Sequence, residues 1–196
     1  MTILGISGSL SESSKTESVV RKALEFANNQ GESVKTDLVS LSDYSLRFCD
    51  GRNPDLYDGD TRIVLDKIDQ ADAYIVGSPI YRGTYSGAFK NLFDLIPNDA
   101  LKGKVIGIVA TGGSDHHYLA IEHQFKPLFG YFNAYTIPGG VYASNRHYSD
   151  GDLFDEEIIS RLNRLAEETV RLSIRLNQTY RGPDYPEIER ETLTES

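Results

Sequence analysis

Short apolar runs and helix-like spacings alternate along the chain. Compact runs rich in β-branched residues are typical of strands buried on both faces of a parallel sheet. They predict five strands, at residues 2–6, 34–41, 73–76, 105–110 and 135–141. Gly77-Ser78-Pro79 is expected to end the third strand, because proline has no N–H for a strand ladder. The Pro-Gly-Gly sequence at 138–140 is expected to break the fifth.

Apolar residues at helical spacing fill the segments between these strands. They predict helices around residues 19–27, 63–68, 86–96 and 118–131, and a last helix that Asp152 can cap. Ser86 is a candidate N-cap for the third helix. Pro127 removes one backbone bond from the fourth helix, so we expect an irregular turn near His123. Residues 44–61, rich in Asp, Gly, Asn and Pro, are predicted to form a loop.

This alternation of strands and helices predicts an α/β fold with a doubly wound parallel sheet. Right-handed crossovers favour a flavodoxin-like, five-stranded sheet of order 2-1-3-4-5 with helices on both faces. We expect a single domain over residues 1–180. Residues 181–196 combine Gly, Pro and acidic residues with few apolar ones, which predicts a flexible C-terminal tail.

The composition narrows the class of protein. The chain has 196 residues, 39% of them hydrophobic and 25% charged, as in soluble globular proteins. A net charge of −9 argues against nucleic-acid or anionic-membrane partners, and no apolar run approaches the length of a membrane span. The N-terminus begins as a strand, without the basic region of a signal peptide, so we expect a cytoplasmic location. The single cysteine, Cys49, excludes an internal disulfide and a cysteine-based metal cluster.

Three polar, glycine-containing loops follow the first, third and fourth predicted strands, at residues 7–16, 78–86 and 111–114. Ligands of open parallel sheets bind at the carboxyl ends of the strands, so these loops are expected to converge on one crevice. A Ser/Gly-rich loop before a helix offers N–H groups and hydroxyls to an anion, although such serines, taken alone, more often only cap the helix. The first loop matches neither a P-loop nor G-x-G-x-x-G. We therefore expect it to hold a phosphate, while the other two frame an aromatic ring system.

Several segments of residues 1 to about 176 resemble the NAD(P)H-dependent FMN reductase family, which has a flavodoxin-like fold. The first loop contributes Gly8-Ser9 and Ser14-Lys15-Thr16. The later loops contribute Gly-Ser-Pro-Ile-Tyr at 77–81, Tyr-Ser-Gly-Ala-Phe-Lys at 85–90 and Ala-Thr-Gly-Gly-Ser at 110–114. The sequence Ala-Ile-Glu-His-Gln-Phe-Lys-Pro at 120–127 is similar to the flavin reductase component of two-component alkanesulfonate monooxygenase systems.

This resemblance implies that the protein uses FMN, with NADPH or NADH as the hydride donor. It implies that the first loop binds the FMN phosphate and that the other loops surround the isoalloxazine, with no acid–base residue and no metal. The implied residues are Ser9, Ser14, Lys15 and Thr16 at the phosphate, Ser78, Pro79, Ile80, Tyr81, Thr111, Gly112, Gly113 and Ser114 around the ring, and Ser86 and Gly87 at the start of the helix beside it.

His123 has a separate implied role. In the related reductases an inserted residue at this place widens one helical turn at the subunit interface beside the flavin, and a single-residue π-bulge would fit. The resemblance therefore implies that His123 affects flavin exchange. The other three histidines are expected in surface or packing roles, because His116 and His117 would diverge by about 100° in a helix and His147 has no ligand set around it.

Three functions are compatible with these features. The first is an FMN reductase that supplies reduced flavin to a partner monooxygenase, and residues 120–127 favour it. The second is a reductase with tightly bound FMN that acts on quinones, azo compounds or metal oxyanions. A flavodoxin-like electron carrier is disfavoured by residues 85–90 and by the missing Thr-rich phosphate loop.

A homodimer or homotetramer is also expected. The predicted helices at 86–96 and 118–132 carry more aromatic residues than one face of a sheet needs, and large apolar patches normally mark interfaces.

Overall fold

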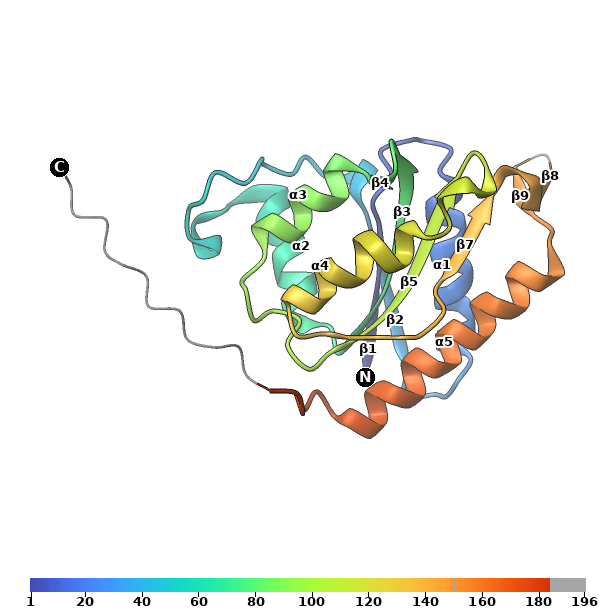
Figure 1. Ribbon diagram of the computed structural model, residues 1–196. Helices are drawn as coiled ribbons and strands as arrows, with labels where there is room; N and C mark the ends of the chain where they lie inside the picture. Colours follow the sequence, from blue (N-terminus) through green and yellow to red (C-terminus); the bar gives the residue numbers. More distant parts are fainter. Residues whose placement is uncertain (150, 184–196) are drawn as a thin grey trace.

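The computed structural model of the protein describes residues 1–149 and 151–183, in which a central sheet lies between two layers of helices (Figure 1). The strands are β1 (Thr2–Ser7), β2 (Lys35–Ser40), β3 (Ala73–Tyr81), β4 (Thr84–Tyr85), β5 (Val105–Gly112), β6 (Tyr135–Thr136), β7 (Val141–Ser144), β8 (Tyr148–Ser149) and β9 (Asp152–Leu153). The α-helices are α1 (Lys15–Asn28), α2 (Gly59–Gln70), α3 (Gly87–Leu95), α4 (Lys126–Tyr131) and α5 (Glu156–Leu176), and a π-helix spans Ile121–Phe125. Single 3-10 turns lie at Leu41–Asp43, Pro54–Leu56, Asp115–His117 and Asn145–His147.

The main sheet has the predicted doubly wound order, β2-β1-β3-β5, with β6 and β7 both parallel to β5. The fifth predicted strand is divided between these last two. Tyr135 pairs with Val105 but Val141 pairs with Val109, so the linker holds two residues more than an unbroken strand would. The Pro-Gly-Gly sequence accounts for this break, since proline removes a ladder donor.

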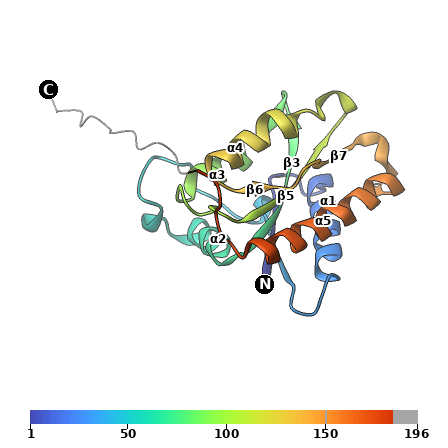
Figure 2. The same cartoon turned by 60° about the horizontal axis from the view of Figure 1, so that its bottom comes forward.

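Side chains of the sheet alternate between two separate cores. Leu4 and Ile6 belong to the core under α2, α3 and α4, whereas Ile3 belongs to the core under α1 and α5. Helices α1 and α5 lie side by side on their face (Figure 2). Both faces are covered, as the continuous apolar runs of β1, β3 and β5 require.

The third strand does not end at Gly77-Ser78-Pro79, and this expectation was wrong. Pairing with β1 stops at Ser7 and Gly77, but pairing with β5 continues to Pro79 and Thr111. The Gly77 carbonyl accepts the Gly8 N–H on the β1 side at 2.8 Å. Residues two apart on a strand turn their backbone groups to the same neighbour, so the N–H that Pro79 lacks would face the side on which β1 has ended.

Residues 78–86, predicted to form a loop, are mostly paired. After β3 the chain turns back through Arg82-Gly83 into β4, which is antiparallel to β3. Tyr81 pairs with Thr84, so the turn has two residues, and Arg82 and Gly83 have φ angles of 56° and 91°. Positive φ at both positions is the type I′ turn that suits the twist of a hairpin.

Of the two N-caps predicted from sequence, that of α3 is confirmed and that of α5 is wrong. Ser86 caps α3 as predicted, since its side chain accepts the Phe89 N–H. The cap of α5 is Asp155, which accepts the N–H groups of Glu157 and Ile158, and not Asp152, which pairs within the β8–β9 hairpin. Helix α2 begins at Gly59, inside the segment predicted as loop.

The segment predicted as one helix over 118–131 consists of the π-helix followed by α4. The expected widened turn around His123 is confirmed: the Lys126 N–H donates to the carbonyl of Ile121, five residues back. Pro127 follows in the first turn of α4 and, having no N–H, cannot continue this bonding pattern.

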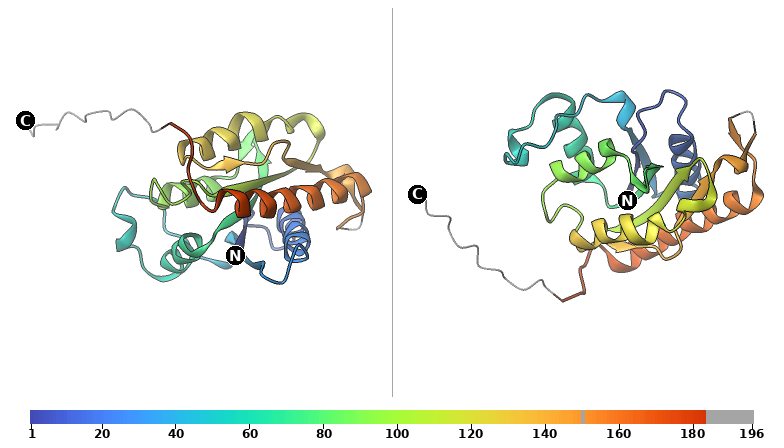
Figure 3. Two further views of the ribbon diagram at one scale, coloured as in Figure 1. Left: turned by 90° about the horizontal axis from the view of Figure 1, so that it is seen from below. Right: turned by 45° about the horizontal axis from the view of Figure 1, so that its top comes forward.

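Both ends of the described chain lie at the amino-terminal edge of the sheet (Figure 3, left). The Met1 ammonium donates to Ser33 O, and beyond α5 the Gln178 amide donates to the Asp72 carboxylate. The Arg181 N–H donates to the Tyr135 hydroxyl at 2.8 Å. The predicted flexible tail at 181–196 lies outside the described residues from position 184 onward. Among the described residues, no helix has the length and hydropathy that a membrane crossing requires.

Candidate functional site

The three loops meet at the carboxyl edge of the sheet, which Figure 3 (right) shows turned toward the viewer. One pocket lies between them, next to the N-terminus of α1. Its lining contains most of the residues implied by the resemblance, namely Ser9, Ser14, Lys15, Thr16, Pro79, Ile80, Tyr81, Thr111, Gly112 and Gly113. Ser11, Ser13 and Asn145 complete the lining. The topological rule that places ligands at strand ends therefore selects a real concavity here.

The serines of the first loop are arranged as hydrogen-bond donors. Ser14 is the N-cap of α1, and its hydroxyl oxygen accepts the Glu17 N–H at 3.0 Å. The Ser9 hydroxyl accepts the Ser11 N–H at 3.2 Å. Each oxygen is thus occupied as an acceptor, while its own hydrogen is free to donate into the pocket. Together with the positive end of the α1 dipole, this donor set suits an anion.

Lys15 is held at the rim by residues that the sequence reasoning missed. Its ammonium donates to the Asn145 side-chain oxygen at 2.9 Å and lies 4.8 Å from the centre of the Tyr148 ring. Burial raises the pKa of Tyr148, so its hydroxyl stays protonated and donates to the Lys15 carbonyl. Asn145 directly follows β7, so the strand-end rule would have found it had the fifth strand been predicted to reach Ser144.

Two threonines connect the first and third loops. The hydroxyls of Thr16 and Thr111 are 2.6 Å apart and both residues are buried. Each hydroxyl therefore has a partner within the protein, and the bond fixes the distance between the two loops. Thr16 was expected at the phosphate, and the structure gives its hydroxyl this second, positional role.

Ser86 connects the second loop to the first, Ser78 forms its hydrogen bonds within the second loop, and neither residue lines the pocket. The Ser78 hydroxyl donates to the Pro79 carbonyl and accepts the Ser86 N–H at 2.9 Å. The Ser86 hydroxyl donates to the Gly8 carbonyl at 2.6 Å and accepts the Phe89 N–H. Both side chains are buried and satisfied, so they position the walls of the pocket.

The glycines of the third loop differ in their surroundings. A Cβ atom on Gly112 would collide with the Tyr142 hydroxyl, which donates to the Ser114 carbonyl at 2.6 Å. A Cβ atom on Gly113 would meet only the Asn145 amide nitrogen, at 3.8 Å. The protein itself therefore requires glycine at 112, while at 113 it leaves open space facing the pocket.

The β3–β4 hairpin forms one wall of the pocket and contacts the π-helix. Tyr81 lines the pocket and is 58% exposed. On the other strand the Thr84 hydroxyl donates to the Gln124 side-chain oxygen at 3.3 Å, and the Tyr85 ring meets the Phe125 ring edge-on at 5.3 Å. These two contacts join the π-helix to the hairpin whose other strand lines the pocket.

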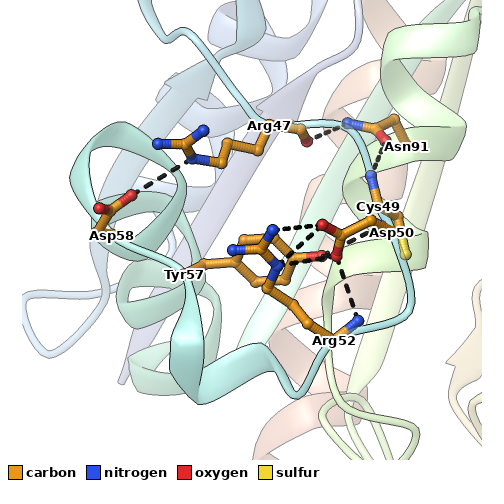
Figure 4. A network of polar contacts seen from close by, with 7 residues as sticks. All are labelled: Arg47, Cys49, Asp50, Arg52, Tyr57, Asp58 and Asn91. Atoms are coloured by element: carbon orange, nitrogen blue, oxygen red, sulfur yellow. Dashed lines mark hydrogen bonds and ion pairs between the residues drawn. The ribbon is translucent and has the colours of Figure 1, made fainter.

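A second pocket lies beside the first loop and contains Gly87. Its lining is mostly apolar and includes Leu10 and Phe48, which are 64% and 83% exposed. Phe48 belongs to the loop that follows β2, and Figure 4 shows how polar contacts hold this loop. Asn91 of α3 accepts the Cys49 N–H and donates to the Arg47 carbonyl, both at 2.9 Å.

Farther along this loop the Asp50 carboxylate accepts hydrogen bonds from the side chains of Arg52 and Tyr57. The Arg52 guanidinium donates to both carboxylate oxygens, and the Tyr57 hydroxyl donates at 3.1 Å (Figure 4). The Arg52 side chain, with its backbone N–H, lowers the pKa of Asp50 far below its ordinary value of 3.8. The described residues contain no group of His, Cys, Asp or Glu placed to hold a metal ion.

Comparison with known proteins places this geometry in a family. The model of the family described as NADPH-dependent FMN reductase matches residues 1–148. An NAD(P)H-dependent FAD/FMN reductase of Geobacillus thermodenitrificans is 43% identical over 88% of this chain and 93% of its own. The NADH-dependent FMN reductase SfnF of Pseudomonas putida is 33% identical over 84% of this chain and 89% of its own.

A solved structure has the same fold. The apo form of the NADH:FMN oxidoreductase EMOB superposes with a TM-score of 0.75 at 25% identity, covering 89% of each chain.

Proposed function

The chain belongs to the NADPH-dependent FMN reductase family, and from this premise we propose where it binds FMN and where the reduced FMN goes. The protein oxidises NADH or NADPH and reduces FMN, as the family match and the related reductases establish. We propose that FMN binds in the pocket between the three loops. The carrying observation is that the loops implied by the family resemblance line one pocket at the carboxyl edge of the sheet.

The residues present suit each part of FMN. The hydroxyls of Ser9 and Ser14, the Lys15 ammonium and the N-terminus of α1 would hold the phosphate, because together they supply donors and positive charge. Tyr81 and the open space at Gly113 would accept the flat ring system. Ser78 and Ser86 would act indirectly, by fixing the walls.

Bound FMN supplies the redox chemistry, since hydride passes directly from the nicotinamide to the flavin. The protein has to align two flat rings and exclude other geometries, which accounts for much of a rate enhancement by itself. The Thr16–Thr111 bond fixes the first loop against the third, and the Ser86–Gly8 bond fixes it against the second. No side chain is needed to accept or donate a proton during this transfer, so we assign no catalytic acid or base.

We further propose that reduced FMN leaves the protein and serves a flavin-dependent monooxygenase. The support is the widened turn at Ile121–Phe125, the place where the resemblance expects it in reductases of this kind. The contacts of Thr84 and Tyr85 with this turn give a route by which it acts on flavin release. We also propose a homodimer or homotetramer in the cytoplasm, with His123 at the interface.

The deciding experiment is steady-state oxidation of NADH and of NADPH, with and without added FMN, after the protein has been stripped of flavin by gel filtration. The proposal expects turnover that depends on added FMN and saturates with it. Undiminished turnover without added FMN, with flavin retained on the protein, would instead establish a tightly bound cofactor and a separate acceptor such as a quinone.

A further inference from the structure

Arg82 occupies a backbone position that its residue type disfavours. It is the first central residue of the two-residue β3–β4 turn and has a φ of 56°. Asn, Asp and Gly are the residues that adopt this conformation readily, and Gly83 follows in the second position. A strained residue retained at the edge of a ligand pocket is a reason to look for a function of its side chain.

The charge of Arg82 is also unbalanced. Its side chain is exposed, and it makes no ion pair or side-chain hydrogen bond within residues 1–149 and 151–183. The other cations near the pocket have partners: Lys15 donates to Asn145, and Arg146 pairs with Asp115 at 3.1 Å. In a protein of net charge −9, Arg82 is an unpaired cation that follows directly on the pocket residue Tyr81.

We propose that Arg82 binds the phosphate groups of the nicotinamide dinucleotide and thereby positions the hydride donor over the flavin. This inference rests on the proposed binding of FMN in the three-loop pocket. Because the first loop would hold the FMN phosphate, the β3–β4 turn is left for the other substrate. A guanidinium binds phosphate through two parallel hydrogen bonds, which fixes orientation as well as distance.

Arg82 could contact either of two phosphate groups of the dinucleotide, and comparing NADH with NADPH distinguishes them. The pyrophosphate is common to NADH and NADPH, whereas only NADPH carries a 2′-phosphate. A contact with the pyrophosphate would affect both donors equally, and a contact with the 2′-phosphate would affect NADPH alone.

The variant Arg82→Asn tests this, because asparagine keeps the turn but removes the charge. With saturating FMN we expect the KM for at least one dinucleotide to rise about tenfold or more, the scale of a charge-assisted hydrogen bond. The dissociation constant of FMN should stay within twofold of the parent. Raising the salt concentration should increase KM in the parent more than in the variant.

Two further variants separate this role from a general effect of charge. Arg82→Lys, which keeps the charge but not the two parallel bonds, should fall between the parent and Arg82→Asn. Arg164→Ala removes an exposed arginine of α5 that has no ion pair among the described residues, and it should change nothing.

An unchanged KM for both dinucleotides in Arg82→Asn, with FMN binding intact, would overturn the inference and leave the proposed function standing. A tenfold loss of FMN affinity in the same variant would also overturn it, by assigning Arg82 to the flavin. Failure of the parent protein to bind FMN at all would count against the proposed function itself.

Discussion

At the scale of single residues, the hydroxyl groups of the three loops divide into those that hold the loops in place and those left free to donate. Thr16, Thr111, Ser78 and Ser86 have their hydrogen bonds inside the protein. Ser14 has only its acceptor role filled, by Glu17. Substitutions in the two groups should therefore fail in different ways.

Replacing Ser14 and Lys15 together by alanine should weaken FMN binding by about 1–3 kcal/mol, the scale of charge-assisted hydrogen bonds. Fluorescence quenching of FMN titrated with protein measures this. Because Ser14→Ala also removes a helix cap, Ser14→Asp is the sharper test: aspartate keeps the cap but repels the phosphate. The double variant Ser18→Ala/Lys22→Ala lies one and two turns farther along α1, outside the pocket lining, and is the matched control. Unchanged affinity in the Ser14 variants would remove the phosphate assignment.

Alanine substitutions at the neighbouring glycines 112 and 113 should have different effects, one on stability and the other on FMN binding. Gly112→Ala should lower the melting temperature, because the added methyl collides with the Tyr142 hydroxyl. Gly113→Ala should leave the melting temperature nearly unchanged, since only the Asn145 amide lies within 4 Å, and yet weaken FMN binding by occupying the space left for the ring. Thermal unfolding and FMN titration of both variants check this. A Gly113→Ala protein with parental FMN affinity would show that the ring lies elsewhere.

At the scale of elements, the π-helix contacts the β3–β4 hairpin, which forms one wall of the pocket. Replacing His123 by alanine should make FMN leave less readily and slow turnover with free flavin. Reduction of FMN already bound should change much less, because the loops set the alignment of the rings. Rapid mixing separates the two steps. If bound-flavin reduction alone is impaired while exchange is normal, then His123 acts in hydride transfer and not in exchange. Lys126→Ala, which removes the ion pair with Glu122 next to His123, is the matched control.

The loop between β2 and α2 should show a small acid sensitivity. The pKa of Asp50 is lowered in the folded protein by Arg52, so its contribution to stability is present above pH 3.8 and is lost on acidification below it. Urea unfolding at pH 6 and pH 3 should therefore show a smaller loss of stability in Asp50→Asn than in the parent. Glu17 of α1, whose pKa is also lowered from 4.5, chiefly by the Ser40 hydroxyl, contributes to the loss in both proteins. Glu32→Gln, an exposed carboxylate without an ion pair among the described residues, should behave like the parent. An equal loss in all three proteins would mean that Asp50 titrates normally.

At the scale of the whole molecule, the aromatic residues from which an oligomer was expected divide into a buried and an exposed group. Phe89, Phe93, Phe129 and Phe132, which motivated the expectation of an oligomer, are buried in the core beneath α3 and α4. The aromatic rings there pack on one another at 4.8–6.5 Å between centres. For these four phenylalanines the reason given from sequence was therefore wrong, whereas Tyr118 and Tyr131, which it also counted, are exposed.

The exposed apolar side chains of this region lie just before the π-helix and at the end of α4. Tyr118, Leu119 and Tyr131 are 59%, 45% and 57% exposed. We expect a dimer or tetramer by sedimentation at micromolar concentration, because contiguous exposed apolar surface normally marks an interface. The double variant Tyr118→Asp/Leu119→Asp should dissociate it, whereas Ile174→Asp, an exposed apolar residue on α5, should not. A parent protein that sediments as a monomer with and without FMN would contradict the expectation.

The strand order and the place of the pocket could be predicted from sequence because both follow from local patterns. Apolar runs mark the buried strands, and strand ends mark the ligand edge. What could not be predicted depends on partners far apart in the chain. Pro79 is tolerated in β3 only because β1 ends beside it, and Ser86 serves Gly8 rather than a ligand. Asn145 was missed because the break at 138–140 hid the true end of the fifth strand.

The position of the chain ends has a practical consequence. Met1 and the segment after α5 are fastened at the amino-terminal edge of the sheet, by Ser33, Asp72 and Tyr135, while the pocket opens at the opposite edge. A tether attached near Arg181 would therefore hold the protein by the amino-terminal edge of the sheet and leave the pocket entrance uncovered. Immobilisation on an electrode or a resin through this end, or genetic fusion to a flavin-consuming enzyme, would keep both substrates' path of entry unobstructed.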